Sequence, residues 1–162
     1  MLTFTVFGVA QSKGSMRAFT PRGMKFPIVT DSNRKAKAWA QLVAEGASRA
    51  LGQQLAPKML TTPIRVTIAF YLPRPKRFAK RGARPIAHLT APDIDKLLRS
   101  VLDALTEVLY LDDAQVVEVL AMKRYADVDV APHVTIRVEE TYGTQALAVP
   151  PAPLPLFEET RV

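Results

Sequence analysis

Four aspartates stand at spacings that suit a divalent metal site. Asp93 and Asp95 form an Asp-x-Asp pair, and Asp112 and Asp113 begin seventeen residues after Asp95. Carboxylates held close together repel one another, so a cluster of them is most easily stabilised by a divalent cation. Such a cation lowers the pKa of an attacking water and neutralises the leaving oxygen of a phosphodiester. The four carboxylates therefore predict metal-dependent hydrolysis of a phosphodiester.

The charge of the chain indicates a polyanionic partner. Residues 1–90 hold 16 Lys and Arg against 2 Asp and Glu, whereas residues 91–162 hold 6 against 13. The whole chain has a formal net charge of +7. Nucleic acid is the commonest anionic partner of a basic domain, although basic charge alone is weak evidence.

The residues available for metal binding favour a hard cation. The chain has no cysteine and two histidines, His88 and His133, so thiolate sites are excluded and a His-rich zinc centre is disfavoured. Oxygen ligands predict Mg²⁺, with Mn²⁺ as the alternative. We expect a cytoplasmic protein with no membrane contact, because there are no disulfides, leader-like N-terminal segment or run long enough to span a membrane.

Alternating and helical hydrophobic patterns predict an α+β domain. We expect strands at residues 2–9, 64–72, 116–123 and 133–139, with the last two forming an antiparallel pair around the turn at Asp127–Asp129. Helices are expected at residues 33–51 and after Pro92. The mixture predicts a mixed β-sheet with two main helices packed on it. One domain spans residues 1–140, and residues 141–162 form a Pro-rich flexible tail.

The two helices place particular side chains. The segment Thr30–Asn33 supplies N-cap candidates for the first helix, and Trp39 lies on its apolar stripe, which favours a core role over base stacking. Asp93 is a natural N-cap for the second helix. Its residues Asp95, Arg99 and Asp103 are spaced four apart and stack along one side. The apolar face of this helix is expected to contain Ile94, Leu97, Leu98, Val101, Leu102, Leu105 and Val108.

Two basic segments are candidates for contacts with DNA phosphates. Residues 11–25 read as a basic loop or loose hairpin, and residues 74–84 hold six cations, no acid and helix-breaking prolines. Solvated surface loops are the alternative. Their closeness in sequence to the acidic segment favours phosphate binding. The predicted DNA-binding residues are Lys13, Arg17, Arg22, Arg74, Lys76, Arg77, Lys80 and Arg81.

Each aspartate also has an ordinary structural interpretation. Asp93 could only cap a helix, Asp95 could only complement its dipole, and Asp112 with Asp113 could form a turn before a strand. A lone Asp-x-Asp is a weak signal. The second pair, the basic segments and the amphipathic helix between them favour the functional interpretation. Arg99 could pair with Asp95 or stabilise charge on a phosphate.

The segment from Pro92 to Lys123 resembles the RusA family of Holliday-junction resolvases. The resemblance rests on Pro92–Arg99, then Leu102–Leu105 with its Asp-Ala-Leu, then the paired Asp112 and Asp113. It implies a RusA-like fold and a Mg²⁺-dependent homodimer that resolves four-way-junction DNA, each subunit cutting one of two opposed strands. It also implies that Asp93, Asp95 and Asp113 are essential metal-binding carboxylates, with Asp112 beside them and Asp103 in support.

The chain departs from the family pattern at two positions. Lys96 stands where the family usually has Asn, and Arg99 stands where it has the catalytic Lys. An arginine keeps the positive charge but does not donate a proton near neutral pH. A non-catalytic protein that binds junction or duplex DNA is therefore an alternative. A nucleotide-sugar transferase that uses Asp-x-Asp for its metal is disfavoured by the short chain and its basic segments.

The tail contains one further motif. Leu154-Pro155-Leu156-Phe157 is similar to the peptides that dock on bacterial sliding clamps, although the usual leading Gln is missing. The alternative is a disordered end that keeps the domain in solution.

Overall fold

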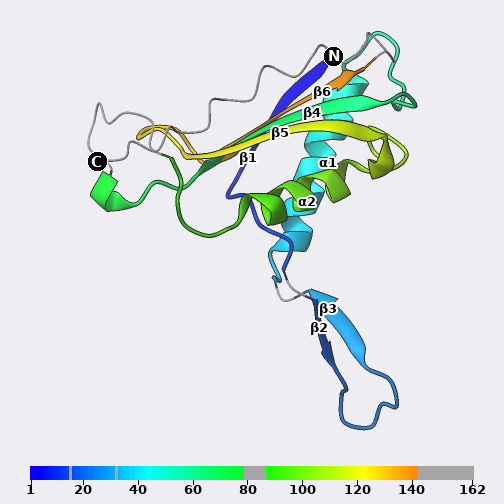
Figure 1. Cartoon of the computed structure of the whole chain (residues 1–162), viewed down its shortest axis with the longest axis vertical. Helices are drawn as coiled ribbons and strands as arrows, with labels where there is room; N and C mark the ends of the chain where they lie inside the picture. Colours follow the sequence, from blue (N-terminus) through cyan, green and yellow to red (C-terminus); the bar gives the residue numbers. More distant parts are fainter. Residues whose placement is uncertain (15, 32, 79–86, 142–162) are drawn as a thin grey trace, which may run out of the picture.

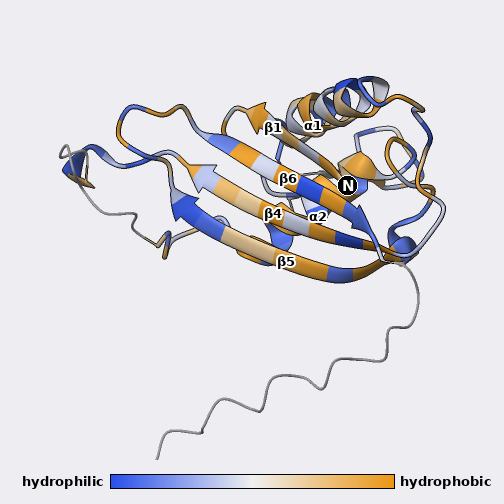
Figure 2. Ribbon diagram, turned by 90° about the horizontal axis from the view of Figure 1, so that it is seen from above, coloured by the Kyte–Doolittle hydropathy of each residue, from blue (hydrophilic) through white to orange (hydrophobic). Residues whose placement is uncertain are grey.

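A four-stranded mixed sheet forms the centre of the protein. The computed structural model describes residues 1–14, 16–31, 33–78 and 87–141. The strands are β1 (Leu2–Phe7), β4 (Ile64–Leu72), β5 (Val116–Tyr125) and β6 (His133–Glu140), in the order β1-β6-β4-β5. β6 runs antiparallel to both β1 and β4, whereas β5 runs parallel to β4. Figure 2 shows the four strands side by side in this order.

Two helices cover one face of the sheet, which confirms the expected α+β arrangement. They are α1 (Ala36–Gly52) and α2 (Ile94–Leu105), and both lie on the same side of the strands (Figure 1). Alternate residues of β4 are buried because successive side chains of a strand point to opposite faces. They join one core with the apolar stripes of the helices. Its members include Ile64, Val66, Ile68, Phe70, Trp39, Val43, Leu97, Val101 and Leu105.

The order of the strands corrects one prediction. We expected β5 and β6 to pair through the turn at Asp127–Asp129, but β4 lies between them. The connection passes across the end of β4 instead, where the Ala126 N–H donates to the Leu72 carbonyl over 2.7 Å. β4 is buried on its helix-facing side along its whole length, and pairing it on both edges satisfies its backbone groups.

The first helix begins later than predicted. Its N-cap is Lys35, not a residue of Thr30–Asn33, and Lys35 makes no side-chain capping hydrogen bond. The Asn33 side chain turns the preceding loop, since its Oδ1 accepts from the Lys35 N–H over 3.1 Å. Trp39 is buried in the core, as expected.

Of the basic loop or loose hairpin expected at residues 11–25, the structure has a hairpin, but it extends further along the chain. The strands β2 (Met16–Phe19) and β3 (Ile28–Asp31) pair with each other in an antiparallel ribbon that projects from the body of the protein (Figure 1). The basic segment that follows β4 begins with a single turn, η1 (Lys76–Phe78). Lys80 and Arg81 lie outside the described residues, as does nearly all of the predicted tail, including Leu154–Phe157. In the described part of the chain, no helix is long and apolar enough to cross a membrane.

Gly46 offers a test of how tightly α1 packs on β1. A Cβ at Gly46 would lie 2.8 Å from Cγ2 of the buried Val6, whereas a Cβ at Gly52 would meet nothing within 4 Å. Valine is stiff at χ1 and cannot move aside easily. We expect Gly46→Ala to lower the free energy of unfolding by about 1–2 kcal/mol. The control Gly52→Ala should leave it unchanged or raise it by about 0.5–1 kcal/mol. Urea unfolding followed by circular dichroism measures both, and equal effects would contradict the packing.

Candidate active site and nucleic-acid interface

The first carboxylate pair is exposed at the start of α2. Asp93 occupies the N-cap position, but its side chain makes no capping hydrogen bond. Its carboxylate instead lies 3.0 Å from the Lys96 ammonium, which raises the pKa of Lys96. Asp95 is exposed in the first turn and has no ion-pair partner among the described residues. Helix capping by its side chain therefore does not account for Asp93.

Lys123 of β5 holds the segment that leads into this pair. Its ammonium donates to the carbonyls of Thr90 and Pro92, both over 2.9 Å. Nearby, His88 is buried against Tyr125, with their rings 4.6 Å apart. Burial, and then the charge of Lys123, lowers the pKa of His88, so its imidazole stays neutral at pH 7. A neutral ring and a charged anchor thus fix the start of α2 to the end of β5.

The second pair follows the other end of α2. Asp112 caps the short turn η2 (Asp113–Gln115) by accepting from the Ala114 N–H over 2.8 Å. Gln115 completes a capping box by accepting from the N–H groups of Leu111 and Asp112. The turn interpretation is therefore correct for Asp112. Asp113 is exposed, and no partner for its side chain is found among the described residues.

Tyr110 fixes this far end of α2. Its hydroxyl donates to the Leu102 carbonyl over 3.0 Å, and its side chain is fully buried. Burial raises the pKa of the Tyr110 hydroxyl, so it remains a hydrogen-bond donor. The last turn of the helix is thereby closed just before the segment that carries Asp112 and Asp113.

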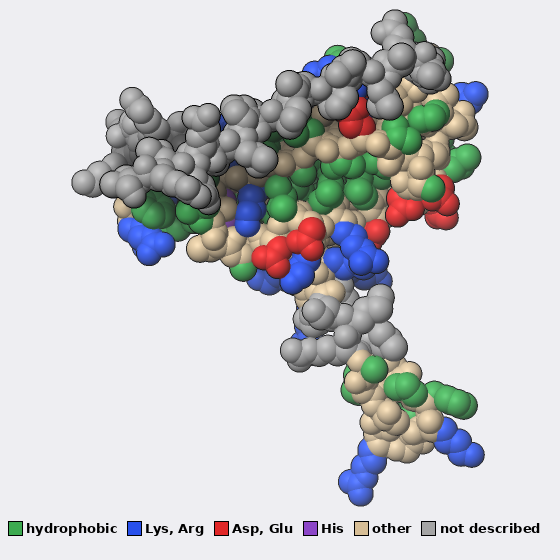
Figure 3. Space-filling model, in the orientation of Figure 1, with side chains coloured by type: hydrophobic (Ala, Val, Ile, Leu, Met, Phe, Trp, Pro, Cys, Tyr) green, Lys and Arg blue, Asp and Glu red, His purple; other side chains and the backbone are tan. Residues whose placement is uncertain are grey.

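One chain does not bring the two pairs together. α2 runs between them, and its twelve residues span about 18 Å at 1.5 Å per residue. The course of β5 shows the same separation. Lys123, late in β5, contacts Pro92 just before α2, whereas η2, which contains Asp113, leads directly into Val116 at the start of β5. Among the described residues, no group of three or more His, Cys, Asp or Glu side chains could hold a metal ion. Figure 3 likewise shows acidic side chains in separate groups.

The exposed side of α2 carries the predicted catalytic cation. Asp95, Arg99 and Asp103 are all exposed along the helix, as their spacing predicts. Asp103 forms an ion pair with Lys13. Arg99 has no ion pair among the described residues. It does not pair with Asp95, and its exposed guanidinium is available to contact a phosphate. The guanidinium presents five N–H donors in a planar array suited to that task.

The predicted DNA-binding cations divide into exposed and structural ones. Arg22 is exposed on the projecting hairpin, while the side chain of Arg17 lies outside what the structure describes. Lys76 and Arg77 are exposed in η1. Arg74 differs, since its side chain is only 4% exposed and its Nε donates to the Ala126 carbonyl over 2.8 Å. Arg74 therefore joins two loops of the protein and does not present its charge to DNA.

Two features of this region were not predicted from the sequence. From the sequence, Lys123 was predicted only to end a strand. In the sheet it lies on the same face as Val119 and Ala121, the face that carries the buried side chains of β4. A lysine at such a position needs acceptors, and this is the signal that would have found it. The hairpin also exposes two aromatic side chains, Phe19 and Phe26. The signal in the sequence is that these aromatic residues lie among basic ones, a pattern typical of single-strand binding.

Comparison with known proteins identifies the family. The family model "Endodeoxyribonuclease RusA" matches residues 13–139, which include the hairpin, both helices and both carboxylate pairs. The chain belongs to the RusA family. The family expected from residues 92–123 is thus confirmed over most of the chain, and it is a family of endodeoxyribonucleases.

A relative of this RusA-family chain occurs in Bacillus subtilis strain 168. It is named "Uncharacterized protein YqaN" and is 28% identical over 149 residues, which cover 86% of this chain and 96% of the relative. The alignment therefore extends over almost the full length of the relative, whose name states no activity.

Removing the Lys123 anchor should loosen the start of α2. The substitution Lys123→Met keeps an apolar stem but leaves two carbonyls without their donor, at a cost of about 1–3 kcal/mol. We expect faster amide hydrogen exchange in residues 93–97, measured by mass spectrometry. Lys58→Met is the matched control, because Lys58 is exposed on a distant loop. Unchanged exchange in residues 93–97 would show that Lys123 does not hold this segment.

Proposed function

We propose that this chain is a structure-selective, Mg²⁺-dependent endodeoxyribonuclease that resolves four-way DNA junctions as a cytoplasmic homodimer. The observation that carries the proposal is a pair of exposed carboxylates, Asp95 and Asp113, for which no hydrogen bond or ion pair is found among the described residues, in a chain that matches the RusA family. Free carboxylates beside strong positive charge are suited to a cation and a phosphate. The proposed substrate is the phosphodiester backbone at the crossover of the junction.

The donor set fits a hard divalent cation. Asp93 and Asp95 offer carboxylate oxygens at the start of α2, and Asp113 offers another beyond its end. Mg²⁺ prefers such oxygen ligands, and Mn²⁺ accepts them too. When bound, the metal would activate a water and neutralise developing charge. Lys96 offsets the charge of Asp93, and Arg99 is placed one turn beyond Asp95 to contact a phosphate oxygen.

A second copy of the chain would complete the site. β5 is an edge strand, and over residues 116–122 it pairs only with β4 among the described residues. Its side chains Val117 and Leu120 are 62% and 56% exposed, which is unusual for a free sheet edge. Two-fold pairing through β5 would run the two strands antiparallel. Asp93 and Asp95 of one protomer would then face Asp112 and Asp113 of the partner subunit.

The projecting hairpin is the proposed grip on the DNA arms. Residues 11–30 carry four Lys and Arg and no acid. Arg22 and Lys25 are exposed near its tip, beside Phe26, which is 79% exposed. Cations of this kind position a protein on phosphates without reading bases, and their contribution falls as salt rises. An exposed aromatic ring adds a surface on which an unpaired base can stack.

A non-catalytic junction-binding protein is the second candidate. The ion pair between Lys96 and Asp93 occupies a carboxylate that the metal would use, and Arg99 cannot supply a proton. Both features would suit a chain that binds DNA but no longer cuts it. Cleavage of a synthetic four-way junction by the unaltered protein separates the two candidates. Salt-sensitive binding without cleavage in either Mg²⁺ or Mn²⁺ would favour the second.

Asp95→Asn tests the site assignment. Loss of one metal-binding carboxylate should reduce Mg²⁺-dependent junction cleavage by about a thousand-fold or more, while binding without metal changes little. The measurement is cleavage of a labelled junction together with a gel-shift titration. Asp129→Asn is the control, because Asp129 is an exposed acid outside the proposed site. Full activity of Asp95→Asn would sink the assignment.

Mixed dimers test whether the site is shared. Asp95→Asn and Asp113→Asn should each be inactive alone, since every site would then lack one carboxylate. If sites are shared, a heterodimer of the two variants contains one intact site of its two. Random pairing makes about half of the dimers heterodimers, so mixing should restore about a quarter of the normal nicking activity. Equal amounts are unfolded, refolded together and assayed for single-strand nicks. A mixture as inactive as its components would mean that each site lies within one chain.

A further inference from the structure

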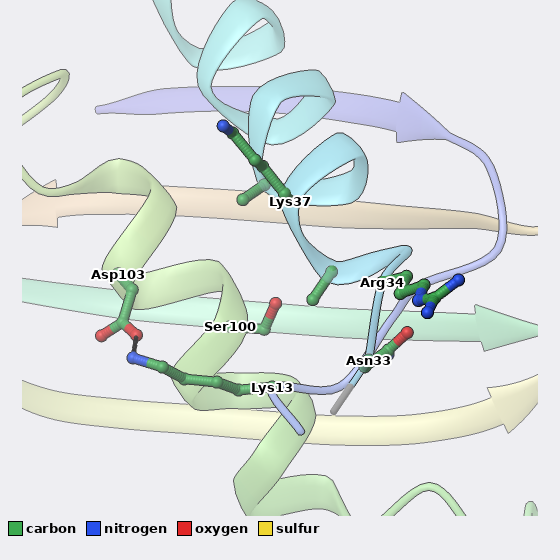
Figure 4. A pocket seen from close by; sticks show the side chains of 8 residues that line it. Lys13, Asn33, Arg34, Lys37, Ser100 and Asp103 are labelled. Carbon is green, nitrogen blue, oxygen red and sulfur yellow. Dashed lines mark hydrogen bonds and ion pairs between the residues drawn. The ribbon is translucent and has the colours of Figure 1, made fainter. Parts of the chain in front are cut away.

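A pocket opens between the start of α1 and the middle of α2, away from the four aspartates (Figure 4). Its volume is about 420 Å³, large enough for a phosphate with part of its nucleotide. The loop before β2 closes one side of it through Lys13. Its lining residues are Lys13, Asn33, Arg34, Ala36, Lys37, Ala40, Ser100 and Asp103.

The charge of the pocket is positive. It contains three cations, Lys13, Arg34 and Lys37, and one acid, Asp103, which pairs with Lys13. Neither Arg34 nor Lys37 has an ion-pair partner within the described part of the chain. Asn33 supports this arrangement by donating to the Ser12 carbonyl over 2.9 Å, which ties the Lys13 loop to the start of α1. The pocket therefore presents two uncompensated cations.

These cations stand where they weaken the helix. The first N–H groups of a helix lack internal partners, and the helix dipole places partial positive charge there. α1 has no side-chain cap and no acid in its first turn, and Lys37 lies in that turn with Arg34 just before it. Positive charge at this end destabilises α1, and such a local conflict is typical of a functional site. A bound anion would offset the charge of both cations.

Ser100 points to a ligand independently of the helix end. Its residue is only 5% exposed, and its hydroxyl has no hydrogen-bond partner among the described residues. Figure 4 shows Ser100 between the paired Lys13 and Asp103 on one side and Arg34 and Lys37 on the other; the ends of Arg34 and Lys37 point away from Ser100 and would turn inward to share a ligand with it. The Ser100 side chain lines the pocket, so its hydroxyl is open to a ligand there. A ligand oxygen in the pocket would accept its hydrogen bond.

The pocket also has a defined place relative to the proposed active site. The Lys13 N–H donates to the Lys96 carbonyl over 3.3 Å, so the pocket adjoins the first turn of α2. Ser100 lies five residues after Asp95, about 7.5 Å along the helix. A DNA strand advances about 3.4 Å per nucleotide along its helix axis, so this distance corresponds to about two nucleotides from a phosphate at Asp95.

We propose that this pocket binds one backbone phosphate of the DNA strand being cut, about two nucleotides from the scissile phosphate, through Arg34, Lys37 and Ser100. The proposal rests on the proposed nuclease function and assigns a further contact to it. The bound phosphate would fix the register of the strand, so that one particular linkage lies beside Asp95. Lys13, held by Asp103, would form the wall of the pocket nearest the active site.

Methylphosphonate scanning tests this contact on the full-length protein. Junctions carry one neutral methylphosphonate at successive positions near the mapped cut, and binding is measured without divalent metal. For the unaltered protein we expect one position, within two nucleotides of the cut, where the replacement weakens binding about ten-fold. In the double variant Arg34→Gln with Lys37→Gln, the same replacement should cost less than about two-fold.

Two further variants complete the design. Ser100→Ala should weaken junction binding about five-fold and halve the methylphosphonate effect. The control Arg49→Gln with Lys58→Gln removes the same charge from exposed positions outside the pocket and should keep the full effect. Without DNA, the Arg34→Gln with Lys37→Gln variant should melt about 1–3 °C higher, because cations leave the start of α1. If the two cations merely supported the fold, the double variant would have a lower melting temperature than the unaltered protein.

The outcomes separate the pocket from the nuclease. Identical methylphosphonate penalties in the unaltered protein and in the Arg34→Gln with Lys37→Gln variant would overturn the pocket assignment while leaving cleavage intact. Binding of inorganic phosphate in the pocket, seen by NMR, without that coupling would also overturn it, since the pocket would then hold a small free anion. Failure of the unaltered protein to bind or cut any junction would instead reject the proposed function itself.

Discussion

The parallel pairing of β4 with β5 is the constraint on which the rest of the structure depends. Parallel neighbours need a connection that returns across the sheet, and α2 provides it by packing Leu97, Val101 and Leu105 into the core. The two ends of α2 consequently lie at opposite ends of β5. Asp93 and Asp95 are therefore separated from Asp112 and Asp113 by roughly the length of the helix.

This separation explains the division of tasks among the aspartates. Lys123 fixes the segment before Asp93, and Gln115 and Tyr110 fix the segment around Asp112 and Asp113. Each pair is held rigidly, yet neither reaches the other. Rigid half-sites at the two ends of an exposed edge strand are well suited to a two-fold dimer, because antiparallel contact brings unlike ends together.

Electrostatics follows the same geometry. The acids of the proposed site are confined to the two ends of α2, while the hairpin and the start of α1 carry exposed cations on either side of the Lys13 loop. A phosphodiester strand can thus meet positive charge before and after the carboxylates. Positive charge at the start of α1 weakens the free protein, and phosphate binding would relieve that cost.

Local patterns in the sequence were sufficient for several features, because they depend on near neighbours. The alternation of β4, the apolar stripes of both helices, the buried Trp39 and the N-cap position of Asp93 follow from strand and helix periodicity. The motif around α2 also predicted the family. Contacts between distant segments could not be predicted in this way. The pairing partners of β5, the buried position of Arg74 and the Lys123 anchor depend on which surfaces meet after collapse.

The sequence by itself therefore determined most of the helices and strands and the family to which the chain belongs. Only the tertiary structure decided that the two aspartate pairs lie far apart in one chain and that Arg34, Lys37 and Ser100 share a pocket. The physical reason is that residue type and periodicity act over a few residues along the chain. Distances between side chains are instead set by the order and direction of strands, which arise from packing across the whole sheet.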